Sequence, residues 1–212
     1  MEGVSGNKYG GILHFSRGAP AIVAETGDSP SRKPRADAER NRLRLLDAAK
    51  SVFGEQGPGA SLEEVARVAG VGIGTLYRRF PTRDALIEAV YRNETGQLMD
   101  AATRLGETCP PVEALREWML LFVDYLGTKY GMSTVFSSIA GGTTALYAGS
   151  STSTRDTITA LVERAVATGE IKLDMEPLDL LRAVAGVASA GPGWQDTARR
   201  LVDILIAGMR TA

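Results

Sequence analysis

Residues 61–80 read SLEEVARVAGVGIGTLYRRF, a pattern typical of two short helices separated by a glycine turn. The hydroxyl of Ser61 can accept a hydrogen bond from the first helical turn, and the two glutamates after Leu62 suit the positive end of a helix dipole. Glycine ends helices readily because it adopts left-handed backbone conformations without a steric penalty. We therefore expect a first helix that begins at Leu62 and ends at Gly70.

The second helix of this stretch is expected to run from about Ile73 to Phe80, and Pro81 ends it. Leu76 and Phe80 are four residues apart and would face the core. Two helices joined in this way form a helix-turn-helix, whose second helix enters a groove of DNA. The spacing alone is equally compatible with a helical hairpin that does not bind nucleic acid.

A longer stretch, AGVGIGTLYRRFPTRDAL at residues 69–86, closely resembles the N-terminal domain of the TetR family of transcriptional regulators. The family pattern is a glycine turn, then Gly-Thr-Leu-Tyr, two variable residues, an aromatic residue, proline, a small hydroxyl residue, a basic residue and an acidic one. The resemblance covers about residues 40–91, where the apolar positions of residues 43–53 fill the place of the family's first helix. Gly72 departs from the pattern, because the family more often has a hydroxyl N-cap there.

The resemblance implies an all-α protein: an N-terminal three-helix, helix-turn-helix DNA-binding domain, then a C-terminal helical ligand-binding and dimerisation domain. We place these domains at residues 32–92 and 93–212, and interpret the Gly-, Ser- and Pro-rich residues 1–31 as a disordered extension. Lys and Arg number 12 against 8 Asp and Glu in residues 32–92, but 12 against 17 in the remainder. Basic charge is therefore concentrated where DNA would bind. The basic residues at 32–35 are expected to form an arm before the first helix. The arm either follows the DNA backbone, enters the minor groove, or stays solvated.

Eight residues are the candidate DNA contacts: Ser61, Ile73, Gly74, Thr75, Tyr77, Arg78, Arg79 and Arg83. If Leu76 faces inward, Gly74 and Arg78 face outward because each helical residue turns by about 100°. We expect Ile73 to contact a thymine methyl group, and Arg78 or Arg79 to donate hydrogen bonds to guanine. Phosphate contacts are expected from the hydroxyl residues Ser61, Thr75 and Tyr77 and from Arg83. The family resemblance supports this role for Tyr77 and Arg83.

The remainder of the chain has a helical pattern throughout. Thr82 is expected to cap a long helix that links the two domains, and the proline pair at residues 110–111 to open the next one. Residues 141–154, rich in Gly, Ser and Thr, are interpreted as a flexible loop, with one turn of helix at Tyr147, that acts as a lid. Further helices are expected over residues 154–168, 177–190 and 194–209.

By resemblance, the second domain should hold a small-molecule pocket, whose candidate lining residues are Trp118, Phe122, Tyr125, Met132, Phe136 and Tyr147. The alternative is that these bulky side chains are ordinary core. The final two helices are rich in small and aliphatic residues that would pack against a second copy: Leu181, Val184, Ala185, Val187, Ala188, Leu201, Leu205, Ile206 and Met209. A two-fold homodimer of this kind predicts a near-palindromic DNA operator.

Catalytic and metal chemistry have little support in the sequence. Cys109 and His14 are the only cysteine and histidine, and they lie in different regions, so we expect no disulfide, no metal site and no cofactor. We find no nucleophile with a matching base and expect no enzymatic activity. No apolar run approaches the ~20 residues that span a membrane, which favours the cytoplasm.

These observations predict a sequence-specific transcriptional regulator, a repressor that a small-molecule effector releases from its double-stranded DNA operator. An activator and a repressor without an effector remain open. From other classes, the alternatives are a helical small-molecule-binding protein without sequence-specific regulation, and an architectural DNA binder, which the modest charge of residues 32–92 disfavours. No motif encodes the effector, the operator or the target genes.

Overall fold

The computed structural model describes residues 32–140, 142–191 and 193–211, so the N-terminal extension and His14 lie outside the described residues. Helices occupy most of the described chain, and it contains no β-strand beyond an isolated bridge between Ile171 and Arg210. The helices are α1 (Arg32–Gln56), α2 (Leu62–Val68), α3 (Ile73–Arg79), α4 (Arg83–Thr108), α5 (Pro111–Gly131), α6 (Ser133–Ser137), α7 (Thr143–Val166), α8 (Pro177–Gly186) and α9 (Trp194–Met209), with short 3-10 turns at Gly57–Gly59 and Val187–Ala190.

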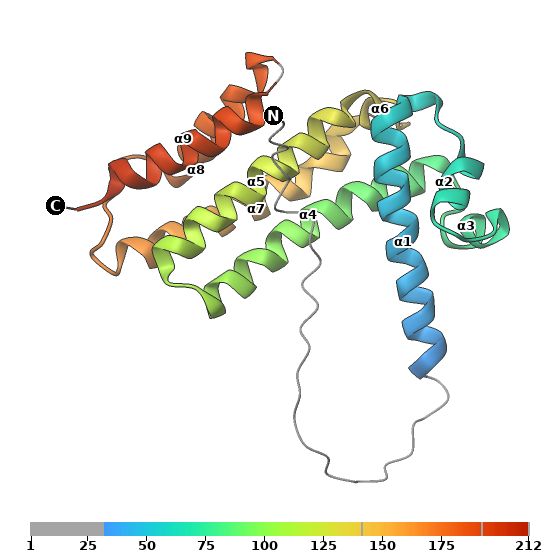
Figure 1. Cartoon of the computed structure of the whole chain (residues 1–212), viewed down its shortest axis with the longest axis horizontal. Coiled ribbons are helices and arrows are strands. Elements are labelled where there is room, and N and C mark those ends of the chain that lie inside the picture. The colour runs from blue at the N-terminus through green and yellow to red at the C-terminus, as the bar shows by residue number, and fades with distance from the viewer. Residues whose placement is uncertain (1–31, 141, 192, 212) are drawn as a thin grey trace, which may run out of the picture.

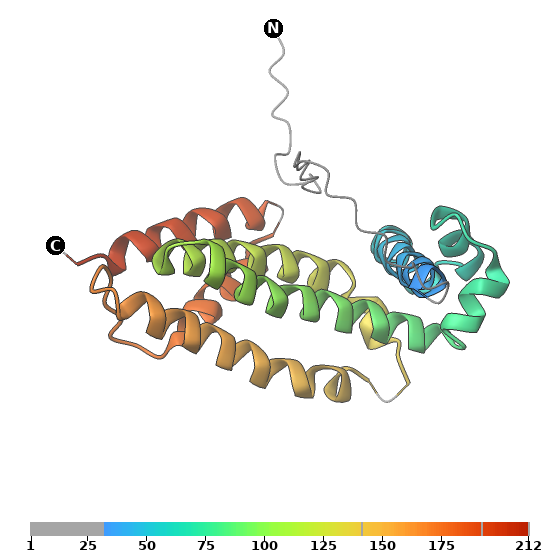
Figure 2. The same ribbon diagram turned by 90° about the horizontal axis from the view of Figure 1, so that it is seen from below.

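The helices form a small head and a larger bundle. Helices α1 to α3 make up the head, and α4 runs from the head into the bundle (Figure 1). There α4 lies beside α5, while α7 packs against both and α9 covers α5 (Figure 2). This is the all-α architecture expected from the sequence, with the helix-turn-helix at one end of the molecule.

The turn between α2 and α3 is fixed by its local sequence. The Ser61 hydroxyl accepts a hydrogen bond from the Glu64 N–H at 3.1 Å and so caps α2. Gly70 has a φ of +66°, and the Val71 N–H after it donates to the Ala66 carbonyl at 3.0 Å. One orphan N–H in the first turn of α2 and one orphan carbonyl in its last turn therefore have partners. Gly72 stands at the N-cap of α3 without a side-chain cap, as its departure from the family pattern predicts.

The head has a core that extends beyond residues 32–92. Phe53, Leu76 and Leu86 are fully buried in it. It also contains the buried side chains of Val135 and Phe136 of α6, of Met132 between α5 and α6, and of Ile139 after α6. No sequence pattern indicated that this later segment completes the head core.

Two predicted segments differ from the structure. The predicted loop and lid at residues 141–154 is wrong, because α7 begins at Thr143. Thr154 Oγ1 in this segment donates a hydrogen bond to the backbone carbonyl of Ser150, one turn earlier in the same helix, at 2.7 Å. Leu146 and Tyr147 pack against the head core, which gives the segment a buried face. The predicted basic arm is also wrong as a separate element, since Arg32–Gln56 is one helix.

The predicted dimerisation surface needs a correction as well. Leu181, Val184, Ile206 and Met209 are buried in the protomer's own bundle core and cannot meet a second copy. The outer surface of α9 carries Ile204 instead, with 66% of its surface exposed. Sequence periodicity identified an apolar face on each helix but did not show which neighbour would cover it.

Candidate nucleic-acid interface and ligand cavity

Helix α3 presents an unusually apolar surface for so short and exposed a helix. Leu76 anchors it to the head core, while Ile73 is 37% exposed and Tyr77 is 46% exposed. Gly74 and Arg78 also face solvent, as predicted, and Thr75 is half-buried. Exposed large apolar residues on a rigid, solvent-facing helix are typical of a binding surface.

The two arginines at the end of α3 have different surroundings. Arg79 donates to the carboxylate of Glu39 on α1 at 3.4 Å, whereas Arg78 donates to the Thr75 hydroxyl of its own helix at 3.3 Å. Both line a hollow of about 300 Å³ between α1 and α3, together with Arg42 of α1. Arg42 was not predicted from the sequence, because the apolar periodicity of the first helix marks only its buried face. We add Arg42 to the candidate DNA contacts.

Arg83 is engaged inside the head. Its guanidinium donates to the carbonyl of Ala60 at 2.5 Å and to that of Pro58, and its central carbon lies 4.7 Å from the centre of the Phe53 ring. These contacts hold the start of α4 against the connection between α1 and α2. Arg83 therefore has a positioning role in the structure, which was not anticipated from the sequence.

Three of the six candidate pocket residues share a cavity in the bundle. The cavity has a volume of about 290 Å³ between α5, α7 and α8, and it is lined by Phe122, Tyr125 and Tyr147 among others. The other three candidates lie elsewhere. Trp118 is fully buried, with its indole N–H donating to the Leu98 carbonyl at 2.8 Å, and Met132 and Phe136 belong to the head core.

A chain of hydroxyl groups connects this cavity to the head. The Tyr125 hydroxyl donates to the Tyr91 hydroxyl at 3.2 Å, and the Tyr91 hydroxyl meets that of Ser150, which donates to the Tyr147 carbonyl at 3.0 Å. Burial, with the Tyr91 hydrogen bond, raises the pKa of Tyr125 well above its ordinary value. The Tyr91 ring also packs edge-on against Phe136 of the head core, with centres 5.5 Å apart. Tyr91 of α4 thus contacts both the cavity wall and the head core.

This position of Tyr91 leads to a stability prediction. Tyr91→Phe leaves the partly buried Tyr125 and Ser150 hydroxyls each short of a partner, so we expect it to lower the free energy of unfolding by about 1 to 2 kcal/mol. Urea unfolding followed by circular dichroism measures the change. Tyr130→Phe is the matched control, because Tyr130 is 46% exposed and its ring contacts Trp194, while its hydroxyl makes no hydrogen bond to any residue that the structure describes. Equal stability of the two variants would show that the hydroxyl chain contributes nothing.

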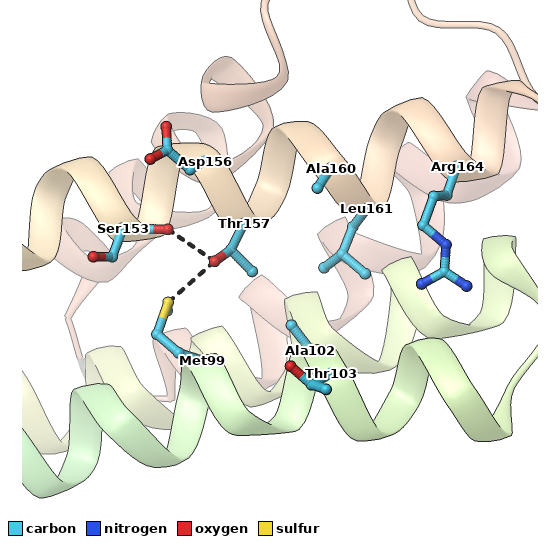
Figure 3. Close-up of a pocket in the computed structure, with 9 residues that line it drawn as sticks. All are labelled: Met99, Ala102, Thr103, Ser153, Asp156, Thr157, Ala160, Leu161 and Arg164. Carbon is cyan, nitrogen blue, oxygen red and sulfur yellow. Dashed lines mark hydrogen bonds between the residues drawn. The ribbon is translucent and has the colours of Figure 1, made fainter.

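A second hollow, of about 520 Å³, lies between α4 and α7 (Figure 3). Two of its polar groups already have protein partners. The Thr157 hydroxyl lies 2.8 Å from the Ser153 carbonyl and 3.1 Å from the Met99 sulfur, and Arg164 donates to the Gly106 carbonyl at 2.7 Å. Its lining residues include no aromatic ring and none of the tyrosines that reach the head. The smaller cavity is therefore the better candidate for a ligand that acts on the head.

Two further features bear on function. No helix in the described ranges combines the length and apolar character needed to cross a bilayer. Among the residues placed by the structure, no three Asp, Glu, His or Cys side chains are grouped so that they could hold a metal ion.

Comparisons with known proteins agree with this geometry. Residues 45–90 match the family model described as bacterial regulatory proteins, tetR family, and residues 110–211 match the C-terminal domain of SbtR-like transcriptional regulators. The structure is similar to that of a TetR transcriptional regulator from Streptomyces coelicolor, with a TM-score of 0.74 and 43% identity over 81% of this chain and 99% of that one.

Curated relatives match over a shorter part. The transcriptional regulator UidR from Escherichia coli is 32% identical over 91 residues, which are 42% of this chain and 41% of UidR. The transcriptional repressor LfrR from Mycolicibacterium smegmatis is 38% identical over 76 residues, which are 36% of this chain and 40% of LfrR. The chain thus spans about two fifths of the length of these relatives.

Proposed function

Because this chain belongs to the TetR family of transcriptional regulators, we propose that it is a repressor that a small-molecule effector releases from its operator. Members of the family are DNA-binding transcription factors and not enzymes, so the helix-turn-helix of α2 and α3 is a DNA-binding element. The similarity to the repressor LfrR supports repression as the direction of regulation.

The exposed surface of α3 is the observation that carries the proposal. We assign base contacts to Ile73, to Arg78 and to the backbone at Gly74, where a Cβ would meet open space and DNA can approach closely. Tyr77 and Thr75 would contact phosphates. Ser61, Arg79 and Arg42 flank this surface and supply further phosphate contacts. Arg83 supports the surface from inside the head.

A homodimer would place two such surfaces on one DNA duplex. We assign the interface to the outer surfaces of α8 and α9, where the exposed Ile204 would be covered. The two α3 helices would then stand one helical turn of DNA apart, ~34 Å, or a multiple of it. A near-palindromic operator follows from this symmetry.

Effector release would be a population shift. An effector that binds better to a dimer with badly spaced heads lowers operator affinity by its differential affinity for the two states. Tyr91 supports α4 as the transmitting element, because it contacts the cavity wall through its hydroxyl and Phe136 of the head core through its ring. A change in the cavity that moves Tyr125 or Ser150 would therefore act on α4 near the head.

The first experiment is fluorescence anisotropy with DNA from the region flanking the protein's own gene, in excess nonspecific competitor. We expect competitor-resistant binding, lower expression from a reporter promoter that carries the bound site, and recovery of expression with an effector found by screening. Binding that competitor erases, on the flanking DNA and on a genomic fragment library, would contradict sequence-specific regulation. Higher reporter expression would identify an activator instead.

A further inference from the structure

The ligand cavity between α5, α7 and α8 has an unbalanced charge. Three of its lining residues are cations, Lys129, Arg155 and Arg182, and no lining residue is Asp or Glu. The chain as a whole carries 24 Lys and Arg against 25 Asp and Glu, so this excess of positive charge is local. A concave site lined by one sign of charge and by apolar walls concentrates ligands of the opposite sign.

Two of the three cations have no carboxylate partner among the residues that the structure describes. Arg182 is paired with Asp179 at 2.7 Å, on the same helix. Lys129 instead lies over the Tyr147 ring, with its Nζ 4.3 Å from the ring centre. Arg155 makes no ion pair with any of the described acidic residues. Arg116, which links α5 to α9 elsewhere in the bundle, does pair with an acid, Asp203, at 2.7 Å.

The remaining walls are apolar and aromatic. Phe122, Leu126 and Leu181 are buried residues of the bundle core that also face the cavity. The half-buried Tyr125 and Tyr147 add aromatic surface, and Ser150 and Thr154 add hydroxyls. The cavity volume of about 290 Å³ lies at the small end of the range for ligand pockets.

From this lining we infer that the effector is a small aromatic anion, a carboxylate or a sulfonate, whose charge lies between Lys129 and Arg155 and whose rings lie against Phe122 and Leu181. The inference rests on the proposed effector-released function, and it specifies the chemistry of the effector. The unpaired cations would gain a partner on binding, while the rings would gain a dry surface. The hollow between α4 and α7 carries no such preference, because it holds both Asp156 and Arg164.

The test uses two fluorescent probes that share a skeleton and differ in charge. The anion is 8-anilinonaphthalene-1-sulfonate, and the neutral analogue is N-phenyl-1-naphthylamine; both brighten when apolar surface surrounds them. We expect the full chain to bind the anion about tenfold more tightly than the neutral probe. Arg155→Gln and Lys129→Met should each weaken the anion about tenfold and leave the neutral probe unchanged.

Arg67→Gln is the matched control, because it removes an exposed guanidinium that pairs with Glu64 on α2, in the head. It should leave the affinity for the anion unchanged. Thermal unfolding of each variant establishes that it is folded. Equal affinity for the two probes, no detectable binding of the anion, or an equal loss in Arg67→Gln and Arg155→Gln would each overturn the inference.

The operator assay separates this inference from the proposed function. Release of the operator by the anion, lost in Arg155→Gln, supports both. Charge-dependent binding of the anion without any change in operator affinity supports the assigned ligand chemistry and contradicts release by such a ligand. Release by a neutral effector, with no charge-dependent binding of the anion, contradicts the ligand chemistry and leaves effector release standing.

Discussion

The double substitution Tyr77→Ala and Arg78→Ala is expected to weaken operator binding by about 1,000-fold or more, because it removes one phosphate contact and one base contact from each of the two heads of the dimer. Each contact of this kind is worth about 1 to 3 kcal/mol. Tyr77 is 46% exposed and Arg78 bonds only to Thr75 of its own helix, so the fold should not change. Anisotropy titrations of wild type and variant at one fixed salt concentration measure the loss.

The two single variants distinguish base-specific recognition from sequence-independent binding to the phosphate backbone. Arg78→Ala should lose affinity for the operator more than for a scrambled duplex, because it removes a base contact. Tyr77→Ala should weaken both duplexes to a similar extent. Arg92→Ala serves as a control, since Arg92 pairs with Glu88 on the exposed surface of α4, outside α3. An operator affinity that the double substitution leaves intact would remove α3 from the DNA interface.

The helix-turn-helix could be predicted from sequence because its determinants are local. Ser61 caps α2 within its first turn, and Gly70 has the positive φ that the turn requires. Leu76 is buried as the helical period predicts. Each of these features depends on residues a few positions away, so no knowledge of the tertiary contacts was needed.

The first half of helix α7 was mispredicted as a loop, because two effects that favour a helix there are not visible in composition; its second half agrees with the helix predicted over residues 154–168. Gly, Ser and Thr lower helix propensity, and the segment at residues 141–154 is rich in them. In the structure the Thr154 hydroxyl bonds to the carbonyl one turn earlier, so it does not compete with the helix. Leu146 and Tyr147 then pack against the head core, and tertiary burial outweighs propensity.

The candidate ligand site was only partly predictable for a related reason. Aromatic residues at helical spacing face either a core or a cavity, and periodicity does not separate the two. Trp118 and Phe122 lie one turn apart with nearly stacked rings, yet only Phe122 lines the cavity. The cations at its edge, such as Arg155, carried no sequence signal because their relation to α5 depends on the packing of α7.

Arg83→Ala is expected to lower the free energy of unfolding by about 2 kcal/mol, since it removes two charged hydrogen bonds and a cation–π contact. The carbonyls of Ala60 and Pro58 would lose their charged donor, and the Phe53 ring would lose its cover. For a chain of this size the melting temperature should fall by roughly 5 °C. Thermal unfolding at one fixed protein concentration measures it, because dimerisation would make the value depend on concentration.

The two roles considered for Arg83 predict opposite patterns. A phosphate contact would leave the melting temperature unchanged and reduce the salt dependence of operator binding by about one unit of slope. A positioning role predicts the lower melting temperature, an unchanged slope, and an operator affinity that recovers on cooling as the head refolds. Arg83→Lys also distinguishes the two roles. A lysine keeps the positive charge that binds a phosphate, but it lacks the planar guanidinium that donates to the carbonyls of Ala60 and Pro58 at once. We therefore expect Arg83→Lys to lose most of the stability that Arg83→Ala loses.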